Sequence, residues 1–247
     1  MTPVSTPDPL LEYRAIWQRK PVLREVYGDI YRRMLAACVP GPILEVGGGS
    51  GNFKSFATGP IVSTDILPAP WLDVVCDAQQ LPFAAGTFAN VVMMDVLHHI
   101  EYPVRCIEET ARLLRPGGRL VMCEPAITPL SGLFYRWLHP EPVDMSADPM
   151  VEGAITPGKD PYDSNQAIPT LLTGRYRDAL AKRVPELELL SAEKFAFVAY
   201  PLSGGFRPWS LLPGSLAKPL LVAEWNLRGL LGNLAGFRLL AAYARRP

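Results

Sequence analysis

A glycine cluster and four acidic residues are the parts of this 247-residue sequence whose types and spacing could do chemistry. The cluster occupies residues 47–51, where four of the five residues are glycine. Glu45, Asp65, Asp77 and Asp95 each stand at or near the end of a short apolar run. Glycine lets the backbone approach a ligand closely, and a carboxylate accepts hydrogen bonds. Together they predict a site for a small ligand rich in hydrogen-bond donors.

The elements that position these residues follow from the apolar runs between them. Continuous apolar runs of this kind are typical of strands buried on both faces of a parallel sheet. A segment with helical spacing lies between Asp95 and a stop signal at residues 115–118. The alternation predicts a doubly wound α/β sheet, which binds its ligands beyond the carboxyl ends of the strands. The predicted strands are residues 43–46, 61–65, 72–77, 89–95 and 119–124.

The flanking regions differ from this core in periodicity and composition. Residues 10–38 have helical spacing broken at Pro21, and residues 125–190 are poorly periodic and rich in aromatic residues and proline. Eight of the 26 prolines crowd residues 125–169. Further strands are expected at 195–200 and 237–243, with a helix at 215–234. We therefore divide the chain into N-terminal helices, a cofactor-binding core, a cap or insertion, and C-terminal strands with an inserted amphipathic helix: residues 1–39, 40–126, 127–192 and 193–247.

Three classes of ligand could use a glycine loop at this place. A phosphate-binding P-loop requires glycine where Phe53 precedes Lys54. A nicotinamide site requires a third glycine where Asn52 stands, and Glu45 would lie awkwardly beside a pyrophosphate. S-adenosylmethionine has no phosphate, and its amino group, ribose hydroxyls and adenine amine all donate hydrogen bonds. The acids favour S-adenosylmethionine, with a nicotinamide-dependent oxidoreductase as a rival interpretation.

The motifs also resemble a known family. Residues 45–51 look like the E/D-x-G-x-G-x-G motif of class I S-adenosylmethionine-dependent methyltransferases. Residues 76–83, 95–99 and 114–118 are similar to the type 11 subgroup, which includes quinone- and sterol-type methyltransferases. The resemblance covers about residues 40–126. It implies a Rossmann-like seven-stranded sheet with strand order 3-2-1-4-5-7-6 and strand 7 antiparallel.

The same resemblance implies how S-adenosylmethionine is held. Glu45 would lie near the amino group of the cofactor, Asp65 would meet the ribose hydroxyls, Asp77 would meet the adenine, and Asp95 would line the methyl-donor end. The glycine loop would lie against the methionine part. The other cofactor-binding residues expected are Gly47, Gly49, Gly51, Ile66, Ala78 and Val96. A catalytically silent binding subunit of the same fold is the alternative function.

Two adjacent histidines follow the fourth predicted strand. If the acceptor of the methyl group is a hydroxyl, a base helps at neutral pH, and the imidazole of His98 or His99 has a suitable pKa. The pair could instead shape the loop, and Glu124 is a weaker candidate. Aromatic residues favour a small or lipid-like acceptor, methylated at oxygen or carbon, unless they form the core of the cap. They are Trp17, Phe134, Tyr135, Trp137, Tyr162, Tyr176, Trp209 and Trp225.

Composition excludes several other classes. The 24 basic and 24 acidic residues balance, which argues against a nucleic-acid partner. The four cysteines form no CxxC pair, so no metal site is expected from them. We see no signal peptide and no apolar run long enough for a transmembrane helix, and we expect a cytoplasmic protein. The helix at 215–234 could contact a membrane surface, pack on the sheet or close a dimer; the oligomeric state stays open.

Overall fold

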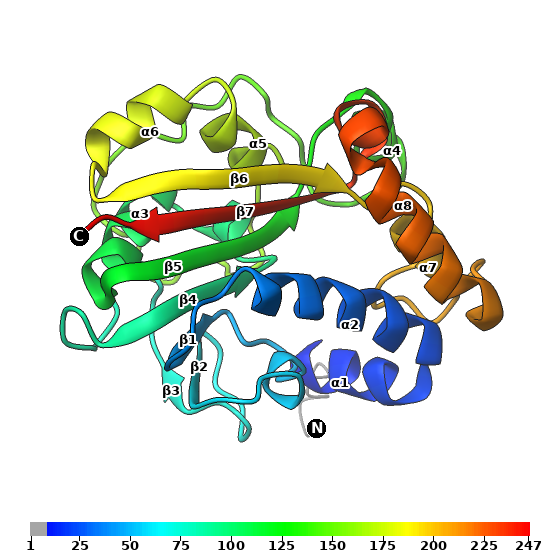
Figure 1. Ribbon diagram of the computed structural model, residues 1–247, viewed down its shortest axis with the longest axis horizontal. Helices are drawn as coiled ribbons and strands as arrows, with labels where there is room; N and C mark the ends of the chain where they lie inside the picture. Colours follow the sequence, from blue (N-terminus) through cyan, green and yellow to red (C-terminus); the bar gives the residue numbers. More distant parts are fainter. Residues whose placement is uncertain (1–8) are drawn as a thin grey trace, which may run out of the picture.

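A seven-stranded sheet runs through the computed structural model, which describes residues 9–247 (Figure 1). The order is β3-β2-β1-β4-β5-β7-β6, and β7 pairs antiparallel with both neighbours while the other pairs are parallel. This confirms the predicted doubly wound architecture, its strand order and its antiparallel strand 7. The strands are β1 (Ile43–Val46), β2 (Ile61–Asp65), β3 (Val74–Val75), β4 (Phe88–Met94), β5 (Leu114–Pro125), β6 (Leu187–Phe195) and β7 (Arg238–Arg245).

The central strands are apolar on both faces because both faces are covered. All four residues of β1 are buried, as are the first six of β4. Successive side chains of a strand point to opposite faces. In β4, Val91 and Met93 accordingly join one core cluster, while Val92 joins the other.

Helices form a layer on each face of the sheet. The helices whose buried residues join one cluster are α3 (Pro103–Leu113), α5 (Ile168–Thr173) and α6 (Arg177–Arg183). Those that join the other cluster are α1 (Pro9–Arg19), α2 (Pro21–Ala36), α7 (Ala199–Ser203) and α8 (Gly214–Ala235). The break at Pro21 and the helix at 215–234 are confirmed. The remaining helical elements are α4 (Pro129–Leu138) and the 3-10 turns η1 (Phe53–Ser55) and η2 (Leu97–His99).

The strand predicted at residues 195–200 is wrong. Strand β6 ends at Phe195, Ala196 has a positive φ of 62°, and α7 follows. The true strand lies upstream and pairs only with β7, at the edge of the sheet. Several of its side chains are therefore exposed, and it lacks the continuous apolar run on which the prediction relied.

The proline-rich region covers the carboxyl ends of the strands. Between α4 and α5 the chain has no regular helix or strand, and it contacts η2 directly. The amide of Asn165 donates to the carbonyl of His98 (2.8 Å), and Lys159 Nζ donates to the carbonyl of His99 (3.1 Å). This region thus closes over the edge at which the candidate site lies. None of the helices among residues 9–247 is long and apolar enough to cross a membrane.

Candidate functional site

A cavity of about 810 Å³ lies at the carboxyl ends of β1, β2 and β4. Its wall brings together the four acids and both histidines. Of the other predicted cofactor residues, Gly47, Gly49, Ile66, Ala78 and Val96 also line it, whereas Gly51 does not. Glu45 and His99, which are 54 positions apart in the sequence, thus line one cavity.

Two glycines are required by the shape of the loop. Gly47 has a φ of +71°, and a Cβ there would lie 2.1 Å from Cγ2 of Val96. Gly51 has a φ of +73°, and a Cβ there would lie 2.4 Å from Cδ1 of Trp71. Both the left-handed backbone and the close neighbours exclude a side chain. Gly51 therefore allows the loop to turn, although this residue does not line the cavity.

The middle of the loop is held from both sides. The amide of Gly49 donates to Oδ2 of Asp65 (2.8 Å), and the carbonyl of Gly49 accepts from Nε1 of Trp71 (2.8 Å). Arg14 on α1 donates to the carbonyl of Ser50 (3.0 Å) and stacks on the Trp71 ring at 4.4 Å. The first helix is therefore fixed to the glycine loop. Sequence reasoning missed Arg14 and Trp71, since no motif marks either.

Glu45 and Asp77 have different surroundings within the same wall. Glu45 is buried and accepts from Oγ of Ser63 at 2.5 Å. Burial raises the pKa of Glu45 to about 7, against the opposing effect of the Ser63 hydrogen bond. Asp77 Oδ1 accepts from the amide of Gln79 (2.8 Å), which orients the carboxylate in a short turn and not at a helix start.

Asp95 pairs with an arginine that the sequence did not single out. Its φ of +57° places the residue in the left-handed region, directly after β4. Oδ1 of Asp95 lies 2.6 Å from Nη1 of Arg238, whose side chain is 1% exposed. The other terminal nitrogen of Arg238 donates to the carbonyl of Cys123 (3.0 Å). A buried cation thus lies at the end of the cavity where the methyl donor is expected.

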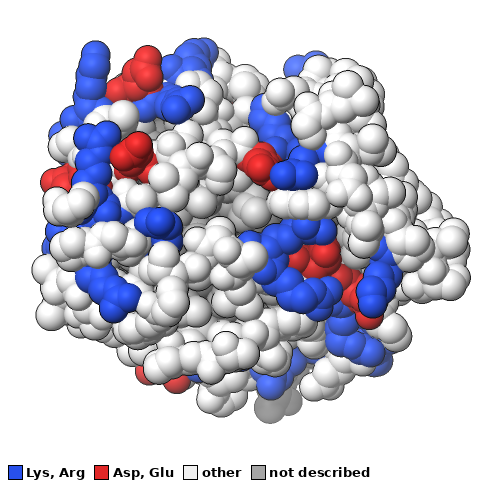
Figure 2. All heavy atoms as spheres, in the orientation of Figure 1, with Lys and Arg blue, Asp and Glu red and all other residues white. Residues whose placement is uncertain are grey.

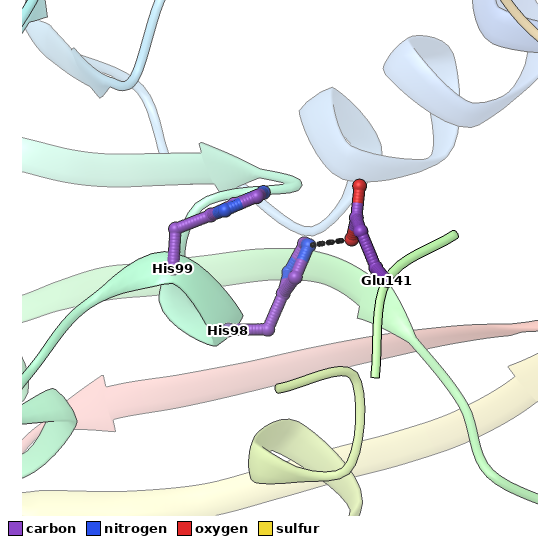
Figure 3. Close-up of side chains that lie close together, drawn as sticks. All are labelled: His98, His99 and Glu141. Carbon is purple, nitrogen blue, oxygen red and sulfur yellow. Dashed lines mark ion pairs between the residues drawn. The ribbon is translucent and has the colours of Figure 1, made fainter. Parts of the chain in front are cut away.

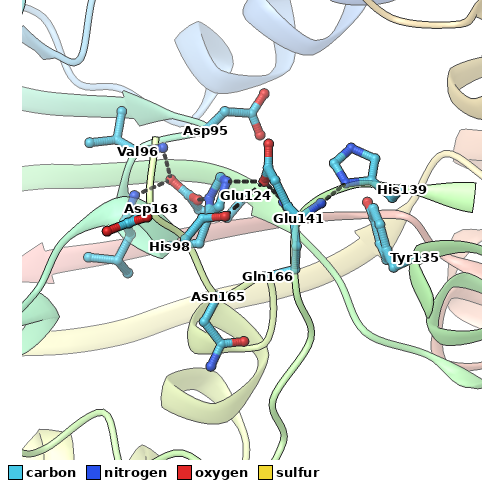
Figure 4. Close-up of polar contacts among 12 residues, drawn as sticks. Asp95, Val96, His98, Glu124, Tyr135, His139, Glu141, Asp163, Asn165 and Gln166 are labelled. Carbon is cyan, nitrogen blue, oxygen red and sulfur yellow. Dashed lines mark hydrogen bonds and ion pairs between the residues drawn. The ribbon is translucent and has the colours of Figure 1, made fainter. Parts of the chain in front are cut away.

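His98 is held between two carboxylates (Figure 4). Its Nδ1 lies 2.7 Å from Oε2 of Glu124, and its Nε2 lies 3.5 Å from Oε2 of Glu141. Oε1 of Glu124 accepts from the amides of Val96 and Leu97, both at 2.9 Å. Burial alone would lower the pKa of His98, but the two carboxylates raise it to about 9. Glu124 therefore ties η2 to the end of β5.

His99 lies beside His98 but is much less constrained. The two ring centroids are 4.1 Å apart, and Nδ1 of His99 is buried without a hydrogen-bond partner. Burial and the neighbouring His98 lower the pKa of His99. Burial alone would raise the pKa of Glu141, but the histidines, His98 foremost, lower it to about 2. Sequence reasoning missed Glu141, which reaches the site from the irregular proline-rich segment.

The predicted aromatic set divides between the cavity and the core. Phe134, Tyr135, Tyr162 and Trp209 line the cavity. Trp137 is 76% exposed, and the other three members pack against the two core clusters: Trp17, Tyr176 and Trp225. Five further aromatic residues line the cavity without having been predicted: Tyr13, Tyr27, Tyr31, Tyr200 and Phe206.

Comparisons with known proteins agree on the type of fold and domain. Residues 44–122 match a family described as a methyltransferase domain. Demethylmenaquinone methyltransferases of Mycolicibacterium vanbaalenii and Streptomyces avermitilis are 38% identical over 117 residues and 32% identical over 109 residues. These alignments cover 46% and 41% of this chain and 49% and 45% of the relatives, so the chain spans about half the length of the curated relatives it matches.

The likeness to solved structures extends over most of the chain. A crystal structure from Thermotoga maritima, described as an S-adenosylmethionine-dependent methyltransferase and possible histamine N-methyltransferase, has a TM-score of 0.54. The match covers 92% of this chain and 91% of that one at 16% identity. At this level of identity the likeness concerns the fold alone.

Proposed function

We propose that the chain, whose residues 44–122 match a methyltransferase domain, is a class I S-adenosylmethionine-dependent methyltransferase that transfers a methyl group to a small or lipid-like acceptor, at oxygen or carbon. The observation that carries this proposal is the row of four carboxylates in one cavity, with two histidines beyond them. S-adenosylmethionine supplies the activated methyl group when bound. The protein then has to position the acceptor and exclude water.

The residues of the cavity fit this cofactor. A Cβ on Gly49 would meet nothing nearer than 4.0 Å, so a ligand can approach the loop backbone closely. Each oxygen of Asp65 accepts one backbone amide, from Gly49 and from Leu67. A carboxylate offers about four acceptor positions, so Asp65 retains capacity for two ribose hydroxyls. We assign the amino group to Glu45 and the adenine to Asp77 and Ala78.

Asp65→Ala is expected to weaken S-adenosylmethionine binding by about 10- to 150-fold. Hydrogen bonds to a charged group contribute about 1.5–3 kcal/mol, and each 1.4 kcal/mol is about tenfold in affinity. Calorimetric titration measures the change. Asp73→Asn is the matched control, because Asp73 lies outside the cavity lining and pairs with Lys54. Equal affinity in Asp65→Ala and the native chain would contradict the assignment.

Affinity for S-adenosylmethionine is expected to rise with pH up to about pH 7 and then level off. The raised pKa keeps Glu45 partly protonated in the free protein, and it must ionise to pair with the cationic amino group. Below pH 7 each pH unit therefore costs up to about tenfold in affinity. Titration at several pH values measures this slope. Glu45→Gln should remove it, and an unchanged slope in that variant would refute this role.

The acceptor fits the other half of the cavity, beyond Asp95. His98, His99, several tyrosines and Phe134 are among the residues that line the cavity, and we assign them to the acceptor half. Aromatic and hydroxyl-bearing walls suit an acceptor with an apolar body and a polar reacting end. The test is S-adenosylhomocysteine formation with a panel of phenols, quinols and lipid-linked acceptors. We expect turnover with at least one apolar member, and turnover only with small hydrophilic amines would contradict the proposed acceptor class.

An exposed apolar surface on α4 and α8 supports peripheral membrane contact as the route for such an acceptor. Phe134 of α4 lines the cavity while its helical neighbours face outward, and Figure 2 shows few charged residues over α8. We expect the chain to float with neutral lipid vesicles, and Leu230→Glu to reduce this. A dimer that buries this surface, with no flotation, would overturn the idea. The exposed residues are Leu130, Leu133, Trp137, Leu138, Leu216, Val222, Leu227, Leu230 and Leu234.

A further inference from the structure

Two histidines and a carboxylate converge in the acceptor half of the cavity (Figure 3). One ring nitrogen of His98, one of His99 and one oxygen of Glu141 all lie within 4.8 Å of one another. Two imidazoles with one carboxylate form a donor set that suits zinc and the neighbouring divalent transition metals. We propose that His98, His99 and Glu141 bind one such ion.

The orientation of His98 is that of a metal ligand. Glu124 holds Nδ1 at 2.7 Å, and the backbone amides of Val96 and Leu97 in turn fix Glu124. This leaves Nε2 directed at Glu141 (Figures 3 and 4). Histidines that bind metals almost always have their other ring N–H held by a carboxylate or carbonyl in this way.

The distance between His98 and Glu141 matches the distance between two ligand atoms of one metal ion. Nε2 of His98 and Oε2 of Glu141 are 3.5 Å apart, longer than an ordinary hydrogen bond of about 2.7–3.2 Å. Two ligands that each lie about 2.0–2.2 Å from one tetrahedral ion are about 3.4 Å apart. By contrast, the second carboxylate beside His98, that of Glu124, lies at direct hydrogen-bond distance from Nδ1.

Two buried polar atoms without hydrogen-bond partners belong to residues of this cluster or bonded to it. Among the described residues, four buried side-chain nitrogen or oxygen atoms have no hydrogen-bond partner, and Nδ1 of His99 and Oε1 of Gln166 are two of them. Gln166 is 3% exposed, lines the cavity, and donates through its amide nitrogen to Glu141. An unsatisfied buried polar atom costs about 1–3 kcal/mol. A cation here would give electrostatic compensation to Oε1 of Gln166 and to Nδ1 of His99 when that nitrogen carries no proton.

The ion would act on the acceptor, and this consequence rests on the proposed methyl transfer. A cation beside the methyl-donor end would bind an acceptor hydroxyl and lower its pKa. The hydroxyl proton passes to water, and the oxygen forms a bond to the methyl carbon. The bond from that carbon to the cofactor sulfur breaks, with its electron pair going to sulfur. Phenols and quinols with a hydroxyl at the reacting end fit this arrangement.

The test is a titration of the metal-free, untagged full chain with Co²⁺, followed by visible absorption, and with Zn²⁺, followed by calorimetry. We expect one saturable site per chain. His99→Ala and Glu141→Gln should each weaken it at least tenfold, and Glu124→Gln by about 10- to 100-fold. Glu101→Gln is the matched control, since Glu101 lines the cavity, pairs with Thr156 and is outside the cluster, and this variant should bind the ion as the native chain does.

Circular dichroism establishes that each variant is folded before its affinity is compared. Absence of a saturable site in the folded native chain would overturn the proposal. So would a site that His99→Ala and Glu141→Gln leave intact, or one that only Glu101→Gln removes. S-adenosylmethionine binding is measured separately on the same samples. Metal binding without cofactor binding would refute the proposed methyl transfer and support the ion site. Cofactor binding without metal binding would refute the ion site and support the proposed methyl transfer.

Discussion

Gly47→Ala is expected to weaken S-adenosylmethionine binding by at least 100-fold. A non-glycine residue at a φ of +71° costs about 1–2 kcal/mol, and the new Cβ would lie 2.1 Å from Cγ2 of Val96. The backbone of Val96 is held by the bond from its amide to the buried Glu124, and its side chain is itself buried. The loop must therefore shift at the point where it meets the cofactor. Calorimetric titration with S-adenosylmethionine measures the loss.

Gly86→Ala is the control for Gly47→Ala, because it introduces the same backbone strain without a steric clash. Gly86 has a similar φ of +68°, and a Cβ there would meet nothing within 4 Å. This variant should lose about 1–2 kcal/mol of folding free energy and bind the cofactor as the native chain does. If Gly47→Ala binds S-adenosylmethionine with native affinity, the glycine loop is not part of the cofactor site.

Asp95→Asn is expected to lower the free energy of unfolding by about 3 kcal/mol. Removal of one member of a buried ion pair leaves its partner uncompensated, which costs about 3–5 kcal/mol. Arg238 is 1% exposed, whereas Asp95 is 32% exposed, so the lower end of that range applies. Asparagine keeps the side-chain size and tolerates the positive φ of 57°, so the change reports on charge alone. Urea denaturation measures it.

An exposed ion pair provides the comparison for this stability change. Glu188 and Arg246 lie 3.6 Å apart, and their side chains are 57% and 59% exposed. Glu188→Gln should change the unfolding free energy by less than about 1 kcal/mol, as is usual for surface pairs. Equal effects of Asp95→Asn and Glu188→Gln would show that the pair with Arg238 contributes little to stability.

The core of the fold could be predicted because local residues encode it. The runs beside Glu45 and Asp95 are buried on both faces, so their signal is continuous along the chain, whereas the run that ends at Asp65 is only partly buried. The strand order and the antiparallel seventh strand came instead from the family resemblance. Strand β6 escaped prediction because an edge strand exposes much of its surface and has no such run.

The rest of the site could not be predicted because its contacts join residues far apart in the sequence. Arg238 meets Asp95, and Glu141 meets His98, through chain segments that carry no motif. Arg14 reaches the glycine loop from a helix whose sequence shows only its apolar stripe. The predicted role of Gly51 in cofactor contact stays a prediction, because the structure places this residue outside the cavity lining.

Titration of the full chain with S-adenosylmethionine is the most direct measurement of what this cavity does. We expect one saturable site in the native chain, retained in Gly86→Ala, weakened about 10- to 150-fold in Asp65→Ala and weakened at least 100-fold in Gly47→Ala. A folded native chain that shows no saturable binding of S-adenosylmethionine, or that binds a nicotinamide dinucleotide in its place, would contradict the proposed methyl transfer.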